Sequence, residues 1–252
     1  MSILQSMILC EPTHSDKLPK FVVDHTPKAG CTIAMKIVFD YMNVLDEALE
    51  YKHPRKWVHD FRIDKYYDRF GRVNESHVND SSYIKVKFVR NPFNRAVSSF
   101  IHCCKHPFLL AEYEHSNPSF NEFLKLLHSK KLGITCGGGH YRIQNSTPEI
   151  PYDEIVKIED SYTRVSEINA KYNSNWKSEY SSPHHFKKCQ RVENFGQRSL
   201  AEVNEFMDQH DNRSPSYDSY YCDETFNLVS CIYEHDIKPL GYTRTLEEIA
   251  LH

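Results

Sequence analysis

"FVVDHTPKAGCTIAMKIVF", residues 21–39, joins a short apolar run to a helical pattern through a loop. The run at 21–23 is typical of the end of a buried strand, and the apolar residues after Cys31 recur at the spacing of one helix face. A helix N-terminus leaves backbone N–H groups without partners and carries partial positive charge. The stretch therefore predicts a strand, a turn and a helix whose start is suited to a phosphate-like anion.

The loop residues add to this anion preference. Gly30 lets the backbone approach a ligand closely, Thr32 contributes a hydroxyl donor and Lys28 contributes a full positive charge. The loop that binds nucleoside triphosphates reads G-x-x-x-x-G-K-[ST]. Here the lysine precedes the glycine and the earlier glycine is missing, which argues against a magnesium–triphosphate site. An ordinary strand-to-helix turn with a surface lysine is the alternative for this loop taken alone.

A second stretch, "VRNPFNRAVSSF" at 89–100, repeats the arrangement. Arg90 follows an alternating strand pattern, and Asn91 is a favoured N-cap ahead of a proline at the first helical position. Ser98 lies two helical turns further on, and Arg95 precedes it by one turn, so both can share a face with the helix start. The planar guanidinium of Arg90 suits a phosphate group, whereas the alternative is a set of surface charges near a helix start.

Acidic residues are absent from both stretches. None occurs at 25–39 or at 81–111, although the chain as a whole has a net charge of −3. The basic residues of these two ranges are Lys28, Lys36, Lys85, Lys87, Arg90, Arg95 and Lys105. Because such segregation creates a local positive field, we expect a ligand with at least two separated anionic groups.

The wider pattern alternates strands with helices, which predicts an α/β fold with a central parallel sheet flanked by helices. We expect strands at 20–25, 55–59, 83–89 and 153–160, and helices at 31–49, 91–104, 117–133 and 223–236. Ligands in such sheets bind at the carboxyl ends of the strands, where both loops lie. We treat 1–252 as a single domain.

Composition narrows the class of function. The modest net charge argues against nucleic acid as a partner and against a charged membrane surface. None of the eight cysteines forms a C-x-x-C pair, so we expect no metal. No apolar stretch reaches the roughly 20 residues of a spanning helix, and the N-terminus lacks the basic start of a signal peptide. We therefore expect a cytoplasmic protein without a membrane span, and we make no prediction of its oligomeric state.

"TPKAGCT" at 26–32 followed by "VRNPFNRAVSSF" at 89–100 resembles the paired signatures of sulfotransferases that use 3′-phosphoadenosine 5′-phosphosulfate (PAPS). The likeness is closest to the carbohydrate, Golgi-type branch, whose members have P-K-x-x-C-T and V-R-[DN]-P-[FI]-x-R-x-x-S. "YDEIVKIED" at 152–160 and "YEHDIKPLGY" at 233–242 resemble later family segments less specifically. The membrane anchor usual in that branch is not seen, which leaves the compartment and the acceptor open.

The resemblance implies a P-loop-like sulfotransferase fold and assigns roles to residues. A donor-binding core would span about 20–105, and acceptor-side loops would lie at about 106–150 and 173–220. PAPS is the implied cosubstrate, and the implied partner is a hydroxyl acceptor, with a glycan as the expected class. The residues implied to hold the 5′-phosphosulfate are Lys28, Ala29, Gly30, Cys31 and Thr32, and those implied at the 3′-phosphate are Arg90 and Ser98, with Arg95 beside them.

An acceptor hydroxyl needs a base, and histidine is suited to this near neutral pH. His59 ends the expected strand at 55–59 and resembles the family's histidine after that strand, with Asp60 beside it. His77 precedes the next strand. His140 begins a histidine-x-x-x-glutamine pattern that weakly resembles an element of carbohydrate sulfotransferases. The choice among these three histidines, or a carboxylate such as Asp60, stays open.

Two other functions also stay open. A protein of this fold that has lost transfer would bind adenosine 3′,5′-bisphosphate without moving sulfate. A kinase-like P-loop enzyme would require magnesium and a nucleoside triphosphate, and the displaced lysine of the first loop argues against it.

Overall fold

The computed structural model describes residues 3–51, 57–106, 117–131, 140–146, 149–180, 189–243 and 245. The chain divides into two compact units. The first comprises Met1–Val89 and Thr147–Pro183, and the second comprises Arg90–Ser146 and His184–His252. Our expectation that 1–252 acts as one domain stays a prediction.

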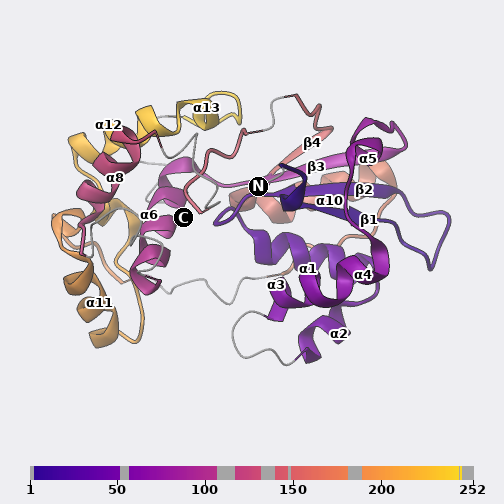
Figure 1. The fold of residues 1–252 in the computed structure, drawn as a ribbon, viewed down its shortest axis with the longest axis horizontal. Coiled ribbons are helices and arrows are strands. Elements are labelled where there is room, and N and C mark those ends of the chain that lie inside the picture. Colours follow the sequence, from indigo (N-terminus) through magenta and orange to yellow (C-terminus); the bar gives the residue numbers. More distant parts are fainter. Residues whose placement is uncertain are drawn as a thin grey trace. The chain divides into compact units, whose positions relative to one another are not determined.

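The first unit contains a four-stranded sheet in the order β1-β2-β3-β4 (Figure 1). Its strands are β1 (Met7–Cys10), β2 (Lys20–His25), β3 (Tyr83–Val89) and β4 (Glu154–Lys157). Strands β2, β3 and β4 run parallel, whereas β1 is an antiparallel edge strand. The predicted α/β fold with a central, mostly parallel sheet flanked by helices is therefore confirmed. The pattern analysis missed the short apolar run that forms β1.

Helices cover the sheet of this unit (Figure 1). They are α1 (Cys31–Tyr41), α2 (Leu45–Glu50), α3 (Trp57–Phe61), the π-helical turn η2 (Arg62–Tyr66), α4 (Tyr67–Phe70), α5 (Glu75–Asn79) and α10 (Ser161–Tyr172). Short 3-10 turns lie at η1 (Ile3–Ser6) and η3 (Ile158–Asp160).

The main core lies between the sheet and α1. Successive strand residues point to opposite faces, so Phe21 and Val23 face the α1 side while Val22 and Asp24 face the other. Trp176 is buried in this core, with its ring centroid 4.5 Å from that of Phe21. The residues that connect β2 to α1 are thus anchored at both ends by buried apolar side chains.

The strand predicted at 55–59 is wrong within the described residues, because 57–61 forms helix α3. Val58 and Phe61 are buried three residues apart, and the Phe61 ring packs edge-on against Phe39 of α1. A spacing of three residues places both side chains on one helix face, whereas in a strand they would point to opposite faces. Residues 55 and 56 lie outside the described residues. His59 is therefore a helix residue and not the end of a strand.

The helix predicted at 31–49 is interrupted. Helix α1 ends at Tyr41, Asn43 adopts a left-handed conformation with φ of 57°, and α2 begins at Leu45. Asparagine tolerates this backbone region better than most residues do, and a left-handed residue cannot continue the helix. The strand predicted at 153–160 is also shorter, since Ile158–Asp160 forms a 3-10 turn.

The second unit is helical in its described residues. Its helices are α6 (Pro92–Lys105), α8 (Phe120–Ser129), α11 (Leu200–Gln209), α12 (Asp223–Ile232) and α13 (Glu234–Ile237), with 3-10 turns η4 (Phe195–Gln197) and η5 (Tyr217–Tyr220). The N-cap predicted at Asn91 is confirmed, because its side chain accepts from the N–H groups of Phe93 and Asn94. Serine–glutamate capping boxes begin α8 and α11, and the sequence analysis missed α11.

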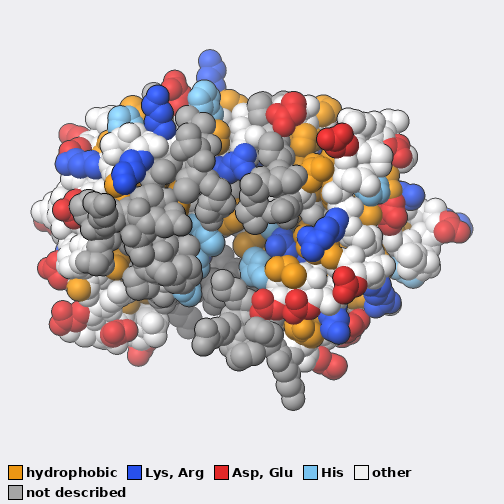
Figure 2. Space-filling model, in the orientation of Figure 1, with side chains coloured by type: hydrophobic (Ala, Val, Ile, Leu, Met, Phe, Trp, Pro, Cys, Tyr) orange, Lys and Arg blue, Asp and Glu red, His pale blue; other side chains and the backbone are white. Residues whose placement is uncertain are grey.

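Acidic and basic side chains are interspersed over the face of the molecule in Figure 2, in keeping with the small net charge. No helix in the described part of the chain is both long enough and apolar enough to cross a membrane.

Candidate functional site

The loop after β2 has an unusual backbone. Lys28 and Gly30 both adopt left-handed conformations, with φ of 67° and 80°, and the Ala29 N–H closes a turn onto the Thr26 carbonyl at 3.0 Å. Gly30 is the N-cap of α1 and has no side chain to cap it. A non-glycine residue in this region is strained, and such strain is concentrated at functional sites.

Gly30 is required for two reasons. Its φ of 80° disfavours any side chain, and a Cβ at this position would lie 2.4 Å from Cγ2 of Ile158, just after β4. The turn thus brings the backbone that precedes α1 against the end of a neighbouring strand. This arrangement places the start of α1 at the carboxyl edge of the sheet, as the sequence predicts for an anion site.

Helix α3 and turn η2 contribute side chains that contact the residues at the two ends of this loop. Nε2 of His59 lies 3.8 Å from Sγ of Cys31, the first residue of α1. Nη1 of Arg62 lies 2.8 Å from Nε2 of His25, the last residue of β2. A histidine and an arginine therefore flank the loop, in addition to Lys28.

His25 is held in its neutral form. It is only 4% exposed, and burial together with the neighbouring Arg62 lowers its pKa to about 3. Because arginine can only donate, Nε2 of His25 accepts and Nδ1 carries the proton. That Nδ1 is buried and has no hydrogen-bond partner among the described residues, and the same holds for Nε of Arg62.

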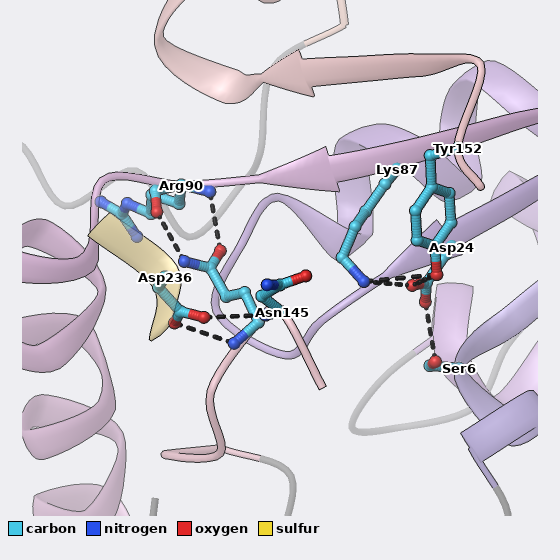
Figure 3. Close-up of polar contacts among 8 residues, drawn as sticks. Ser6, Asp24, Lys87, Arg90, Asn145, Tyr152 and Asp236 are labelled. Carbon is cyan, nitrogen blue, oxygen red and sulfur yellow. Dashed lines mark hydrogen bonds and ion pairs between the residues drawn. The ribbon is translucent and has the colours of Figure 1, made fainter. Parts of the chain in front are cut away.

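A buried ion pair joins the two strands β2 and β3 (Figure 3). Nζ of Lys87 on β3 donates to Asp24 on β2 at 2.7 Å, and the Tyr152 and Ser6 hydroxyls donate to the same carboxylate. Burial by itself would raise the pKa of Asp24, but Lys87 and these hydrogen bonds outweigh it and lower the pKa. Since Lys85 likewise donates to backbone carbonyls, these two lysines are engaged within the sheet.

In the second unit, a glutamine side chain forms two hydrogen bonds with the backbone of Arg90 (Figure 3). The N–H of Arg90 donates to Oε1 of Gln144, and Nε2 of Gln144 donates back to the Arg90 carbonyl, both at 2.8 Å. The Asp236 carboxylate accepts in turn from the backbone N–H groups of Gln144 and Asn145. Burial raises the pKa of Asp236, which Arg95 and these N–H groups only partly offset. The guanidinium of Arg90 is half-buried and reaches the Tyr217 hydroxyl at 3.4 Å.

The other predicted donor contacts of this unit differ in exposure. Ser98 is half-buried on α6, whereas Arg95 is fully buried. Nη2 of Arg95 donates to the His140 carbonyl at 3.4 Å, and its guanidinium lies 5.9 Å from the ring centre of Tyr233. Burial lowers the pKa of Arg95. The contacts of Ser98 and Arg95 with the 3′-phosphate of PAPS stay predictions.

The three histidines predicted as bases lie in different settings. His59 flanks the loop, as described above. His77 lies in α5, where its Nδ1 accepts from the Asn74 N–H at 3.1 Å and completes a capping box. His140 belongs to the second unit, and its ring stacks on that of His102 with centroids 4.3 Å apart. Of the two that lie in the first unit, His59 contacts Cys31 at the start of α1, whereas His77 is engaged in the N-terminal cap of α5.

The sequence analysis missed four of these residues, namely His25, Arg62, Gln144 and Asp236. His25 directly follows the apolar run before the loop, and Gln144 ends the histidine-x-x-x-glutamine pattern, so both carried a local signal. The contact between Arg62 and His25 joins residues far apart in the sequence and has no such signal. In the described part of the chain, no group of three or more His, Cys, Asp or Glu side chains is placed to hold a metal ion.

Comparison with known proteins identifies the family. The model of the sulfotransferase family matches residues 13–243, which is most of the chain. Searches of curated proteins and of solved structures gave no match. The chain therefore belongs to the sulfotransferase family, a family of PAPS-dependent transferase enzymes.

Proposed function

We propose that this protein moves the sulfuryl group of PAPS to a carbohydrate hydroxyl by in-line displacement, with a histidine as the general base. The observation that carries the proposal is the loop after β2, where Lys28 and Gly30 are both left-handed at the N-terminus of α1. A loop of this kind directs backbone N–H groups and a lysine toward an anion. The carbohydrate acceptor rests on the resemblance of the two signatures to the carbohydrate branch.

The residues of the two stretches fit a donor with two anionic ends. We assign the 5′-phosphosulfate to the loop residues Lys28, Ala29, Gly30, Cys31 and Thr32, and the 3′-phosphate to Arg90 and Ser98 with Arg95 beside them. The buried and unpartnered Nδ1 of His25 at the same loop supports an anionic ligand there, because such donors are rarely left without an acceptor.

Charge stabilisation is the main catalytic task in this proposal. PAPS supplies an activated sulfuryl group, and negative charge grows on the bridging oxygen of its leaving phosphate as transfer proceeds. Lys28 and the N–H groups at the start of α1 stabilise that charge, and their fixed geometry requires little reorganisation. Sulfuryl transfer should resemble phosphoryl transfer in depending on positioning and electrostatics.

We assign the base to His59. Its contact with Cys31 supports this choice, because it places an imidazole at the loop that would hold the sulfuryl group. The hydrogen bond from the Asn74 N–H engages Nδ1 of His77 in a helix cap, and we keep His77 and His140 as the alternatives.

Transfer of labelled sulfate from PAPS to a panel of oligosaccharides, tyrosine peptides and small alcohols tests the proposal. We expect label in an oligosaccharide and loss of turnover in Lys28→Gly, which removes the charge but keeps the left-handed backbone free of strain. The control is Lys125→Gln on an exposed surface pair with Glu224. Transfer to no acceptor, together with tight binding of adenosine 3′,5′-bisphosphate, would identify a binding protein and overturn the proposal.

The base is tested separately with His59→Asn. We expect a lower kcat with unchanged affinity for adenosine 3′,5′-bisphosphate, because the base acts on the acceptor and not on the donor. Full activity in this variant would move the base to His77 or His140.

A further inference from the structure

Arg62 has a cationic side chain without an anionic partner. It is half-buried, it donates to His25 at 2.8 Å, and its guanidinium carbon lies 5.7 Å from the ring centre of Tyr67. Within the described residues no carboxylate forms an ion pair with it, and its Nε is buried without a hydrogen-bond partner. A partly desolvated cation in this state is costly unless an anion joins it.

His25 holds Arg62 without cancelling its charge. A carboxylate in this position would neutralise the guanidinium, whereas a neutral imidazole fixes its direction and leaves the positive charge intact. His25 also keeps its own Nδ1 proton buried and unpartnered. The last residue of β2 and the first residue of η2 therefore carry two N–H donors without a hydrogen-bond partner among the described residues, and His25 directly precedes the loop that begins with Thr26.

We propose that Arg62 binds the sulfate or phosphate oxygens of the 5′-phosphosulfate as a second cation beside Lys28, and that His25 is the positioning residue that holds it there. This inference rests on the proposed function and adds two residues that neither signature contains. The ligand chemistry is a sulfate or phosphate ester held by a planar guanidinium.

Adenosine 5′-phosphosulfate is the probe that isolates this contact, because it lacks the 3′-phosphate assigned to Arg90. Its affinity is measured by calorimetry for the wild type, Arg62→Gln and Arg62→Lys. Loss of a charge-assisted hydrogen bond is expected to weaken binding about 10- to 100-fold in Arg62→Gln, with a smaller loss in Arg62→Lys. The matched control is Arg69→Gln, an exposed arginine of the adjacent helix α4, which should bind as the wild type does.

The role of His25 is tested by a double-mutant comparison. His25→Gln keeps an oxygen that can accept from Arg62 and should bind within about threefold of the wild type, whereas His25→Leu should resemble Arg62→Gln. Combining His25→Leu with Arg62→Gln should weaken binding no further than Arg62→Gln alone. Additive losses would overturn the positioning role.

The outcomes separate this inference from the function on which it rests. A wild type that binds neither adenosine 5′-phosphosulfate nor adenosine 3′,5′-bisphosphate would overturn the proposed function. A wild type that binds both, with Arg62→Gln binding equally well, would overturn only the role of Arg62. If Arg62→Gln does not fold, Arg62→Lys carries the same test, since it keeps the charge and loses only the planar fork.

Discussion

Lys28 and Gly30 show how little freedom individual residues have in the loop that joins β2 to α1. Two left-handed residues flank Ala29, which is fully buried, so the chain reverses within a few residues before α1 begins. Glycine supplies one of these conformations without strain, whereas the lysine does not. A lysine kept in a strained conformation at this point is more readily explained by its charge than by its backbone preference.

Gly30→Ala should be strongly destabilising. The left-handed conformation costs about 1–2 kcal/mol for alanine, and the clash with Ile158 adds about 1–3 kcal/mol. In an Ile158→Ala background only the backbone part should remain, because the colliding methyl group is gone. Urea unfolding of the two single variants and the double variant measures this coupling, and additive free energies would contradict it.

His25 should make stability depend on pH. The native pKa of His25, about 3, lies below the ordinary histidine pKa of 6.5, so between these values the unfolded chain binds a proton that the native chain does not. The stability that the neutral form of His25 contributes is therefore complete above pH 6.5. It is lost as the pH falls, by about 1.4 kcal/mol of unfolding free energy per pH unit. Urea unfolding near pH 6.5 and near pH 5 should show the wild type losing up to about 2 kcal/mol more than His25→Gln. Equal losses in the two proteins would contradict a buried neutral imidazole.

At the scale of the elements, the adjacent strands β2 and β3 each contribute one side chain to a buried ion pair. Asp24 and Lys87 are register partners on β2 and β3, so their ion pair connects the strands that precede the two sequence signatures. Both side chains are almost fully buried, at 3% and 1% exposed. A one-residue slip of either strand would move these groups to opposite faces, which ties the ion pair to one register.

Replacing only one partner of this ion pair should destabilise the protein more than replacing both. Lys87→Met leaves a buried carboxylate without its cation and should cost about 3–5 kcal/mol of unfolding free energy. The double variant Lys87→Met/Asp24→Asn should lose less unfolding free energy than the two single variants lose together, because no unpaired buried charge remains. Lys20→Met, at an exposed ion pair with Glu11 at the start of β2, is the control and should stay within about 0.5 kcal/mol of the wild type. Losses that simply add in urea unfolding would show that the pair is not coupled.

Helix α3 shows where element prediction failed. Its sequence combines a tryptophan, a valine and a phenylalanine, types that favour strands, whereas the burial of Val58 and Phe61 in the core shared with α1 decides for a helix. By contrast, the cap at Asn91 and the strand at 83–89 were predicted correctly, because a local side-chain hydrogen bond and a strict alternation determine them.

At the scale of the whole molecule, a nucleotide that binds at the proposed PAPS site should raise the melting temperature of the protein. A ligand at about 100 times its Kd stabilises a folded protein by about 2.7 kcal/mol, which for a chain of this size raises Tm by about 5–10 °C. Adenosine 3′,5′-bisphosphate should produce such a shift, and magnesium–ATP should produce a smaller one because the loop lacks the triphosphate pattern. Scanning fluorimetry measures both, and an equal or larger shift with magnesium–ATP would favour the kinase-like alternative.

The sequence alone determined the α/β class, β2, β3, the Asn91 cap and the two stretches that mark the family, because each depends on neighbouring residues and local spacing. Tertiary structure alone decided that 57–61 is a helix, that Gln144 clasps Arg90 and that Arg62 meets His25. These features join residues distant in the chain, and their energies come from burial and from paired donors and acceptors that exist only after folding. Residue spacing does not encode such contacts, so the sequence could not predict which side chains surround the loop between β2 and α1.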